Sequence, residues 1–397
     1  MTLRMIENPA ARAPGRYREH EVLSHAAAAT AYRMITACPR YAPTPLRPLD
    51  RVAAQAGVGA VWYKDESGRF DIGSFKALGG AYAVARLLLR HAAARLGREV
   101  TVADLVHGGL RPVTQQITVT CATDGNHGRS VAAGAQVFGC RGVIFLHRDV
   151  SAGREAAIRA FGADIVRVAG NYDASVRAAT RAAEQHGWEI VSDTSWPGYE
   201  EVPRDVMQGY TVMLIEVLQQ LQATAARLPT HVFVQGGVGG LAAAVCAHLW
   251  EAMGSAAPIT VVVEPERADC LFQSARAGRP TPASGDLSTV MAGLSCGEVS
   301  SEAWRILAAG ARFFITIDDA PAIAAMRLLA HRGATAAPIV AGESATAGLA
   351  ALLAAAADPA LRRQLALAAD SSILLIGSEG ATDPTLYQEL VGKGAGA

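Results

Sequence analysis

The sequence predicts an α/β protein whose parallel sheets are covered by helices on both faces. From residue 117 onward, short apolar runs alternate regularly with Ala-rich helical patterns, and this alternation is typical of parallel strands joined by crossover helices. The chain has 397 residues, of which 51% are hydrophobic and only 18% are charged. A chain of this length and composition is too large for one small core, so we expect about two domains.

The part of the chain before residue 117 predicts separate elements. In order, these are a helix at 21–35, an extended segment around Pro43 and Pro45, a short helix at 49–56, a strand at 61–63, a helix that starts at Lys76 and a polar excursion at 97–116. The two prolines restrict the backbone, because each fixes its own φ and disfavours helix at the residue before it.

The regular series follows. Its expected strands are 117–123, 142–147, 165–168, 189–193, 231–235, 259–263, 313–317 and 373–376, and its expected helices are 126–139, 152–162, 174–187, 206–221, 241–253, 320–332 and 346–357. We predict a small domain at 86–205, inserted into a larger domain built from 1–85 and 206–397. Ligands of such folds bind at the carboxyl ends of strands, so the active site is expected there, in the cleft between the domains.

Composition excludes several classes of function. Lys plus Arg and Asp plus Glu are both 36, and a net charge of zero gives no electrostatic reason to expect nucleic acid or an anionic membrane as partner. Six cysteines are scattered without a C-x-x-C pair, which argues against a disulfide scaffold or a metal site. No apolar run has the length of a signal or membrane-spanning segment. We expect a cytoplasmic protein with reduced thiols.

Lys76 is the first residue with a chemical interpretation. It lies between Phe75 and Ala77-Leu78, and Gly79-Gly80 follow. Such an apolar setting is predicted to lower the pKa of the amine by desolvation and to leave it nucleophilic, as a Schiff-base lysine requires. The alternative is an ordinary lysine at a helix end whose ammonium reaches water.

A glycine-rich loop follows the strand expected at 231–235. Gly236, Gly237, Val238, Gly239 and Gly240 lead directly into a helix, and backbone amides at such a place bind phosphate. The same residues fit G-x-G-x-x-A, with Glu264 at the end of the next strand, which is the dinucleotide fingerprint. A nucleotide, another phosphate and a plain tight turn all remain open from this loop alone.

Three other strand ends carry polar residues. Thr123, Asp124, Gly125 and Asn126 precede a helix, so they either cap it or bind a carboxylate and a cofactor. Asp193 begins a loop after the fourth expected strand of the series, and Ser378 follows the last expected strand. Taken singly, these two residues also fit a plain loop and a turn.

Together the motifs resemble the fold-type II family of pyridoxal 5'-phosphate enzymes, related to tryptophan synthase β, and within it the diaminopropionate ammonia-lyases. The motifs are Y-K-D-E-S-x-R-F (63–70), S-F-K (74–76), A-T-D-G-N-H-G (122–128), D-T-x-W-x-G-Y (193–199), M-Q-G-Y (207–210), G-G-x-G-G (236–240), A-D-C-L (268–271), M-A-G-L-x-C-G-E (291–298) and E-G-x-T-D (379–383). Two departures stand out. Ser378 is threonine as often in the family, and a glycine commonly follows Glu343-Ser344.

The resemblance implies a role for each matched residue. Lys76 would hold the cofactor aldehyde as an imine and later act as an acid or base at Cα, and Gly236 to Gly240 would bind the 5'-phosphate. Asn126 would contact the ring 3'-oxygen. Ser378 would face the pyridine nitrogen, and a neutral hydroxyl there favours α,β-elimination of a β-leaving group. The resemblance also implies a homodimer.

Two aspartates point to the substrate. Related dehydratases carry a small residue in place of Asp124, so the resemblance implies elimination of ammonia from 2,3-diaminopropionate, with pyruvate as product. Thr123, Asp124, Gly125 and Asp193 would bind the substrate. Asp124 would take the Cα proton of the D-isomer, whereas Lys76 would take that of the L-isomer. Asp193 would also be catalytic, because it would orient the amine or relay a proton. We expect the pKa of one carboxyl to be raised by the other.

Alternative functions remain. A serine or threonine dehydratase, or a β-replacement synthase, would use the same cofactor. A dinucleotide-dependent oxidoreductase would explain Glu264 but not Lys76, Asn126 or Ser378, and a binding protein without activity would not need Lys76. The resemblance places Cys270 and Cys296 near the site entrance, and we expect both to be reduced, with a disulfide as the alternative.

Overall fold

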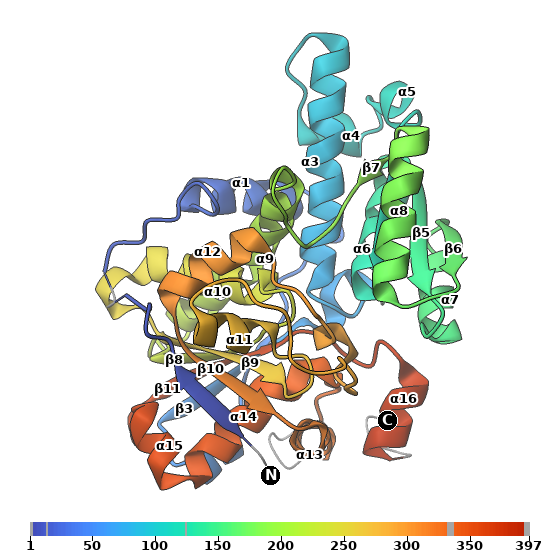
Figure 1. Ribbon diagram of the computed structural model, residues 1–397. Helices are drawn as coiled ribbons and strands as arrows, with labels where there is room; N and C mark the ends of the chain where they lie inside the picture. Colours follow the sequence, from blue (N-terminus) through green and yellow to red (C-terminus); the bar gives the residue numbers. More distant parts are fainter. Residues whose placement is uncertain (1–2, 13–14, 124, 332–336, 393–397) are drawn as a thin grey trace.

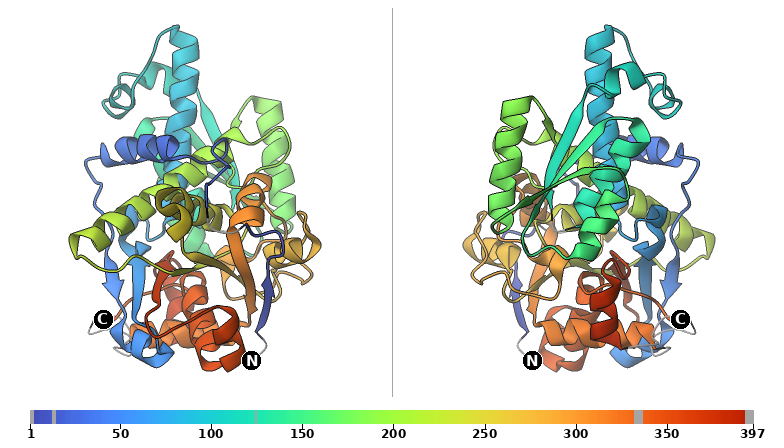
Figure 2. Two further views of the ribbon diagram at one scale, coloured as in Figure 1. Left: turned by 90° about the vertical axis from the view of Figure 1, so that its left-hand side faces the viewer. Right: turned by 90° about the vertical axis from the view of Figure 1, so that its right-hand side faces the viewer.

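The structure is a computed structural model that describes residues 3–12, 15–123, 125–331 and 337–392. It consists of two lobes, each built on one sheet (Figures 1 and 2). The sheet of the large lobe has seven strands in the order β1-β10-β9-β8-β11-β3-β2. These strands are β1 (Arg4–Glu7), β2 (Leu46–Pro48), β3 (Ala60–Asp65), β8 (His231–Gln235), β9 (Ile259–Pro265), β10 (Ala311–Ile317) and β11 (Ser372–Gly377).

The five inner strands of the large sheet are parallel, and only the edge strands β1 and β2 are antiparallel. The small lobe has a parallel four-stranded sheet in the order β6-β5-β4-β7. Its strands are β4 (Thr118–Thr123), β5 (Arg141–His147), β6 (Asp164–Val168) and β7 (Glu189–Ile190). The prediction of parallel α/β sheets is confirmed. The small sheet lies inside the range predicted for the small domain, while the domain bounds themselves stay a prediction.

Helices cover both faces of the large sheet. They are α1 (His25–Thr36), α2 (Asp50–Ala56), α9 (Glu201–Ala223), α10 (Gly240–Met253), α11 (Cys270–Ala277), α12 (Ser301–Gly310), α13 (Asp319–Ala330), α14 (Ala347–Ala357), α15 (Pro359–Gln364) and α16 (Pro384–Val391). Side chains of β8 alternate between two cores: Val232 and Val234 pack with α9, α10 and α12, whereas Phe233 packs with α2, α13 and α14. This period of two is what a central strand buried on both faces requires.

The small lobe contains α6 (Asn126–Phe138), α7 (Ala152–Arg159) and α8 (Tyr172–His186). The long helix α3 (Lys76–Leu96) begins in the large lobe and runs along the small lobe beside α6 (Figure 1). Gly80 and Gly134 allow this close approach, because a Cβ at Gly134 would lie 2.9 Å from Ala81 Cα. The polar excursion after α3 contains two short helices, α4 (Val102–Val106) and α5 (Arg111–Thr114).

The structure differs from the predicted elements in a few places. The strand expected at 189–193 ends at Ile190. Val191 N still donates to Thr120 O, and the chain then turns so that Ser192 N donates to the Tyr199 hydroxyl. The elements β1, α11, α12, α15 and α16 were not predicted, because they are short or lie in mixed sequence. Among the described residues, every helix is too short or too polar to cross a membrane.

Candidate active site

Lys76 is the first residue of α3, and its side chain reaches the segment that follows β7. Its Nζ forms an ion pair with Asp193 Oδ2, and the side chains of Lys76 and Asp193 are only 19% and 15% exposed. The ammonium also lies 5.4 Å from the ring centre of Phe75 and 5.9 Å from that of Tyr210. The structure therefore brings together two of the predicted catalytic residues, one from each side of the lobe boundary.

The predicted protonation state of Lys76 is wrong. Burial alone would lower its pKa, but the charge of Asp193, with smaller contributions from Tyr210 and the hydrogen bond to Asp193, holds the pKa well above its ordinary value. The pKa of Asp193 is correspondingly lowered, because Lys76 and then His127 outweigh the opposing effect of burial. The sequence neighbours of Lys76 could not reveal this ion pair, since Asp193 lies 117 positions further along the chain.

The turn that carries Lys76 is tied to the end of β11. Phe75 N donates to Ser378 O at 2.9 Å, and Ser74 forms an isolated β-bridge with Glu379. Lys76 N donates to Ser74 Oγ at 3.3 Å. Ser378 is buried, and its hydroxyl lies 3.5 Å from Gln235 Nε2, which comes from the end of β8. The structure thus places Lys76 and Ser378 on hydrogen-bonded neighbouring segments.

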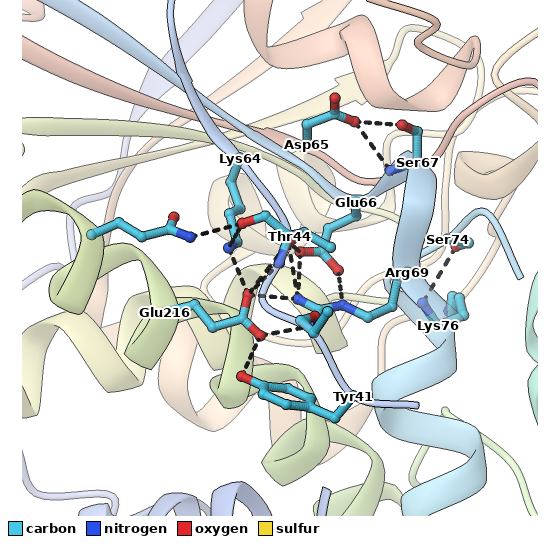
Figure 3. Close-up of polar contacts among 12 residues, drawn as sticks. Tyr41, Thr44, Lys64, Asp65, Glu66, Ser67, Arg69, Ser74, Lys76 and Glu216 are labelled. Carbon is cyan, nitrogen blue, oxygen red and sulfur yellow. Dashed lines mark hydrogen bonds and ion pairs between the residues drawn. The ribbon is translucent and has the colours of Figure 1, made fainter. Parts of the chain in front are cut away.

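Beside this turn lies a group of four buried charged side chains that we call the buried charge cluster: Lys64, Glu66, Arg69 and Glu216 (Figure 3). Lys64 Nζ donates to Glu216 Oε2 at 2.6 Å, and Arg69 donates to both Glu66 and Glu216 at 2.7–2.9 Å. Their side chains are 0–1% exposed. Because every charge has a hydrogen-bonded partner of opposite sign, the cluster can exist in the core.

The buried charge cluster explains the Y-K-D-E-S-x-R-F motif. Lys64 is the penultimate residue of β3, and Glu66 and Arg69 lie in the 3₁₀ segment Glu66–Asp71 that follows. Phe70 and Asp71 then adopt left-handed backbone conformations with φ of 52° and 59°. Such conformations are uncommon for these residues and persist where surrounding contacts hold them. We infer that the cluster fixes the path of the chain into Lys76.

The glycine-rich loop after β8 has the geometry of an anion cradle. Gly237 and Gly239 have φ of 65° and 101°, which favour glycine. A Cβ at Gly236 would lie 2.6 Å from Glu264 Cγ. Within the described part of the chain, the amides of Gly237 and Val238 donate to no protein group, and α10 begins at Gly240. Two unpaired amides at a helix N-terminus fit a phosphate group.

The predicted substrate loop is described except for Asp124, which lies outside the described residues. Thr123 Oγ1 accepts hydrogen bonds from Gly125 N at 3.0 Å and Gly128 N at 3.1 Å, so this hydroxyl caps the start of α6. Asn126 Nδ2 donates to Glu379 Oε2, across the lobe boundary. A contact of Asn126 with a cofactor ring is therefore untested, but Asn126 does lie at the boundary with the segment that contains Ser378.

Sequence reasoning missed several residues of this site. His127 lies beside Asp193, with Nδ1 3.9 Å from Asp193 Oδ2 and Nε2 donating to Val191 O at 2.7 Å. Burial lowers the pKa of His127 against the opposing charge of Asp193, so the ring is neutral near pH 7. Glu379 and Tyr210 also belong to motifs quoted above, and only their contacts identify them as site residues.

Glu264 has a structural partner instead of a nucleotide ribose. Its carboxylate accepts from Leu271 N at 3.0 Å and Phe272 N at 2.7 Å, at the start of α11. The side chain is fully buried, and burial raises its pKa to about 8 although these backbone amides oppose the shift. This contact removes the feature that favoured a dinucleotide.

The two thiols discussed above flank the glycine-rich loop. Cys270 Sγ donates to Gly237 O at 3.4 Å, and Cys296 Sγ would lie 3.6 Å from a Cβ at Gly237. All six cysteines lie within the described residues, and none of them is in a disulfide there. The redox state of the thiols stays a prediction.

Comparisons with known proteins agree with this geometry. Residues 38–378 match the family model described as pyridoxal-phosphate dependent enzyme. The chain is 38% identical to a diaminopropionate ammonia-lyase from Salmonella typhimurium over 365 residues, which cover 90% of each protein. A crystal structure of the Escherichia coli diaminopropionate ammonia lyase in complex with D-serine matches with a TM-score of 0.89 and 34% identity, over 98% of this chain and 97% of that one.

A second crystal structure of the same Escherichia coli enzyme contains an aminoacrylate-PLP azomethine reaction intermediate. It matches with a TM-score of 0.88 and 35% identity, over 98% of this chain and 97% of that one. Both the sequence and the fold of this chain are therefore similar to those of ammonia-lyases along almost their whole length.

Proposed function

Because this chain belongs to the family of pyridoxal-phosphate dependent enzymes, of fold type II, we propose that it eliminates ammonia from 2,3-diaminopropionate. With water, the products are pyruvate and two molecules of ammonia. The observation that carries the proposal is the Lys76–Asp193 ion pair between the lobes, in a chain that is 38% identical to a diaminopropionate ammonia-lyase over 90% of its length.

The cofactor accounts for the electron demand of the reaction. Bound pyridoxal 5'-phosphate supplies a conjugated ring that withdraws the electron pair left at Cα when its proton departs. The residues that would hold it are Lys76 at the aldehyde, the amides of the glycine-rich loop at the phosphate and Ser378 at the ring nitrogen. Asn126 would lie at the 3'-oxygen. The unpaired amides of Gly237 and Val238 and the buried Ser378 hydroxyl support this fit.

Asp193 gives the site its preference for a charged substrate. Its carboxylate is shielded and ionised, as its lowered pKa requires. It can stabilise a proton on Lys76 Nζ after removal from Cα, and it can attract the cationic second amine of diaminopropionate. The hydroxyl of serine offers no such charge. We assign Asp124 as the base for the D-isomer and Lys76 as the base for the L-isomer.

Borohydride reduction of the holoenzyme, followed by peptide mass mapping, tests the cofactor site. We expect the label on Lys76, and a label on another lysine would contradict the assignment. Steady-state turnover should be fastest with diaminopropionate. Faster turnover of serine or threonine would instead support a dehydratase. Asp124→Asn is expected to lower turnover of D-diaminopropionate roughly 100-fold or more, while L-diaminopropionate is affected far less and the cofactor remains bound.

Assembly and location are part of the same proposal. A homodimer is supported by the family resemblance, and a cytoplasmic location is supported by six cysteines that form no disulfide among the described residues. We also propose that the small lobe, with domain bounds 86–205, closes on the large lobe when substrate binds, since water must be excluded from the reacting atoms. Sedimentation at micromolar concentration tests the dimer without bearing on the chemistry.

A further inference from the structure

The small lobe contacts the large lobe through α7, at the end of the lobe that faces α16 (Figure 1). Arg154 Nη2 in α7 donates to Glu343 Oε1 at 3.0 Å, although the two residues are 189 positions apart in the chain. The side chains of Arg154 and Glu343 are 16% and 3% exposed. This ion pair is shielded from water, so it is a stronger contact than an exposed pair.

The same arginine supports the predicted substrate loop. A Cβ at Gly125 would lie 3.2 Å from Arg154 Cδ and 3.6 Å from its Cγ. The aliphatic part of Arg154 therefore packs directly under the backbone of Gly125, and only glycine fits there without displacing it. One side chain thus contacts the loop with its stem and the other lobe with its guanidinium.

Two further contacts cross the boundary nearby. Ser151, the N-cap of α7, donates to Asp383 Oδ2 at 2.9 Å and accepts from Arg154 N at 3.2 Å. Asn126 donates to Glu379. The acceptors belong to adjoining segments of the large lobe, because Gly342 N donates to Glu379 O at 3.0 Å. The first turns of α6 and α7 are therefore held by one part of the large lobe.

We infer that Arg154 is a positioning residue, which uses its ion pair with Glu343 to hold Gly125 and the start of α6 in their binding geometry across the lobe boundary. The inference rests on the proposed function only for the identity of the substrate. The contacts of Arg154 are with Ser151, Glu343 and Gly125, so it acts through the substrate loop and not on the cofactor.

The chain offers a matched control on the same helix. Arg159 also lies in α7, but it pairs with Glu155 at 2.7 Å within the small lobe, and its side chain is 58% exposed. Arg159→Gln removes the same charge from the same helix without touching the boundary. Any effect of Arg154→Gln that Arg159→Gln lacks is therefore due to the contact between the lobes.

The first test is steady-state kinetics of the holoenzyme with L-diaminopropionate. Arg154→Gln should raise KM roughly 10- to 100-fold, because small displacements of a substrate loop have effects of this size, while cofactor absorbance stays at the wild-type value. Arg159→Gln should leave KM unchanged. Glu343→Gln keeps an acceptor for Arg154 and should raise KM only a few-fold, and Arg154→Lys should recover part of the loss.

The double variant Arg154→Gln/Glu343→Gln separates positioning from general damage. In Arg154→Gln alone, Glu343 has already lost its hydrogen-bond partner across the boundary, so the second substitution should make KM no worse or better. The inference would be overturned if the increases in KM of the two single variants added up in the double variant. A wild-type KM in Arg154→Gln would also overturn it. An equal rise of KM in Arg159→Gln would do so as well.

Hydrogen–deuterium exchange gives a readout that does not depend on the substrate. Arg154→Gln should accelerate exchange in peptides that cover the Thr123–Gly128 loop, and Arg159→Gln should not. Unchanged exchange in that peptide contradicts the positioning role even if the proposed reaction is wrong. A wild-type enzyme that fails to turn over diaminopropionate would contradict the proposed function alone.

Discussion

Two groups of charged contacts surround Lys76, and they differ in how completely they are enclosed. The buried charge cluster lies within the large lobe, and each of its carboxylates receives several hydrogen bonds. The boundary contacts are Lys76–Asp193, Arg154–Glu343, Ser151–Asp383 and Asn126–Glu379, with one hydrogen bond each. Both groups are polar and shielded, but only the second joins the two lobes.

This difference shows how the buried charge cluster can stay fixed while the boundary between the lobes can open. A charge in the cluster has no access to water unless the core opens, so its partner cannot be removed without a large loss of stability. A charge at the boundary becomes hydrated as soon as the lobes separate. Hydrogen bonds to water then replace those to the lost partner. We conclude that the cluster sets the position of Lys76, whereas the boundary contacts set the position of the substrate loop against it.

The largest expected effect is on the stability of the cluster. Arg69→Met keeps the side-chain volume but removes two of the three hydrogen bonds to Glu66 and two of the six to Glu216. Breaking a buried pair in this way costs about 3–5 kcal/mol. We expect a loss of this size in urea unfolding followed by fluorescence.

The control is Arg227→Met. Arg227 pairs with Asp370, and these side chains are 58% and 73% exposed, so no measurable loss is expected. If Arg69→Met were no less stable than Arg227→Met, the distinction between the two groups of contacts would be lost.

A second prediction uses pH, because the pKa of Glu216 in the cluster and the pKa of Glu343 at the boundary are shifted in opposite directions. In the cluster, the hydrogen bonds and charges of Arg69 and Lys64 outweigh burial and lower the pKa of Glu216. Its stabilising contribution is therefore present above the unfolded pKa and is lost only as the pH falls below it. At the boundary, burial and then Glu379 raise the pKa of Glu343 from 4.5 to about 7, with Asp383 adding to the shift and Arg154 opposing it.

The raised pKa of Glu343 determines in which direction the stability of the boundary changes with pH. Its contribution to stability is fully present below about pH 4.5 and is lost as the pH rises through about 7. A shift of this size corresponds to at most about 3 kcal/mol. Rising pH between these values should weaken the boundary while the cluster stays intact.

The measurement is the difference in stability between the wild type and Glu343→Gln at pH 5 to 8. We expect the wild type to lose about 1–3 kcal/mol relative to the variant over this range. Taking the difference removes the contribution of Glu264, whose pKa is also raised. A constant difference, or a wild type that gains stability with rising pH, would show that Arg154 dominates the environment of Glu343.

These contacts also mark the limit of what the sequence predicted. The strands, the glycine-rich loop and Lys76 were predicted because each depends on a local pattern: an apolar run, glycines before a helix, or a lysine in an apolar segment. The alternation of strand and helix was enough to predict the class of fold. Short elements such as α11 and α12 were missed because eight to ten residues carry little periodicity.

The electrostatics of the site could not be predicted in the same way. The protonation of Lys76 was predicted from its neighbours in sequence, and the structure reverses it because Asp193 is its neighbour in space. We expected a raised pKa for at least one of a pair formed by Asp124 and Asp193. The structure lowers the pKa of Asp193, and because Asp124 lies outside the described residues, the expectation for the pair stays a prediction. The raised pKa of Glu343 was not expected. No local pattern connects residues that the fold brings together from separate lobes.

The smallest expected effect lies at the rim of the buried charge cluster. Tyr41 donates its hydroxyl to Glu216 Oε1 at 2.9 Å, and its ring packs against Tyr32 and Phe70 at centroid distances of 6.4 Å. Burial and then Glu216 hold the pKa of Tyr41 well above its ordinary value, so the hydroxyl remains a donor at any working pH. Tyr41→Phe removes this one donor and keeps the ring contacts.

The loss in Tyr41→Phe should be small because Glu216 keeps its other donors. Lys64, Arg69 and the amide of Thr44 still donate to it, the last at 3.1 Å, so the carboxylate is not left unpaired. We expect a loss of about 1 kcal/mol in urea unfolding and an unchanged KM for diaminopropionate. A rise in KM comparable to that of Arg154→Gln would show that the buried charge cluster also acts on the substrate loop. The division of roles between the cluster, which positions Lys76, and the boundary contacts, which position the loop, would then be wrong.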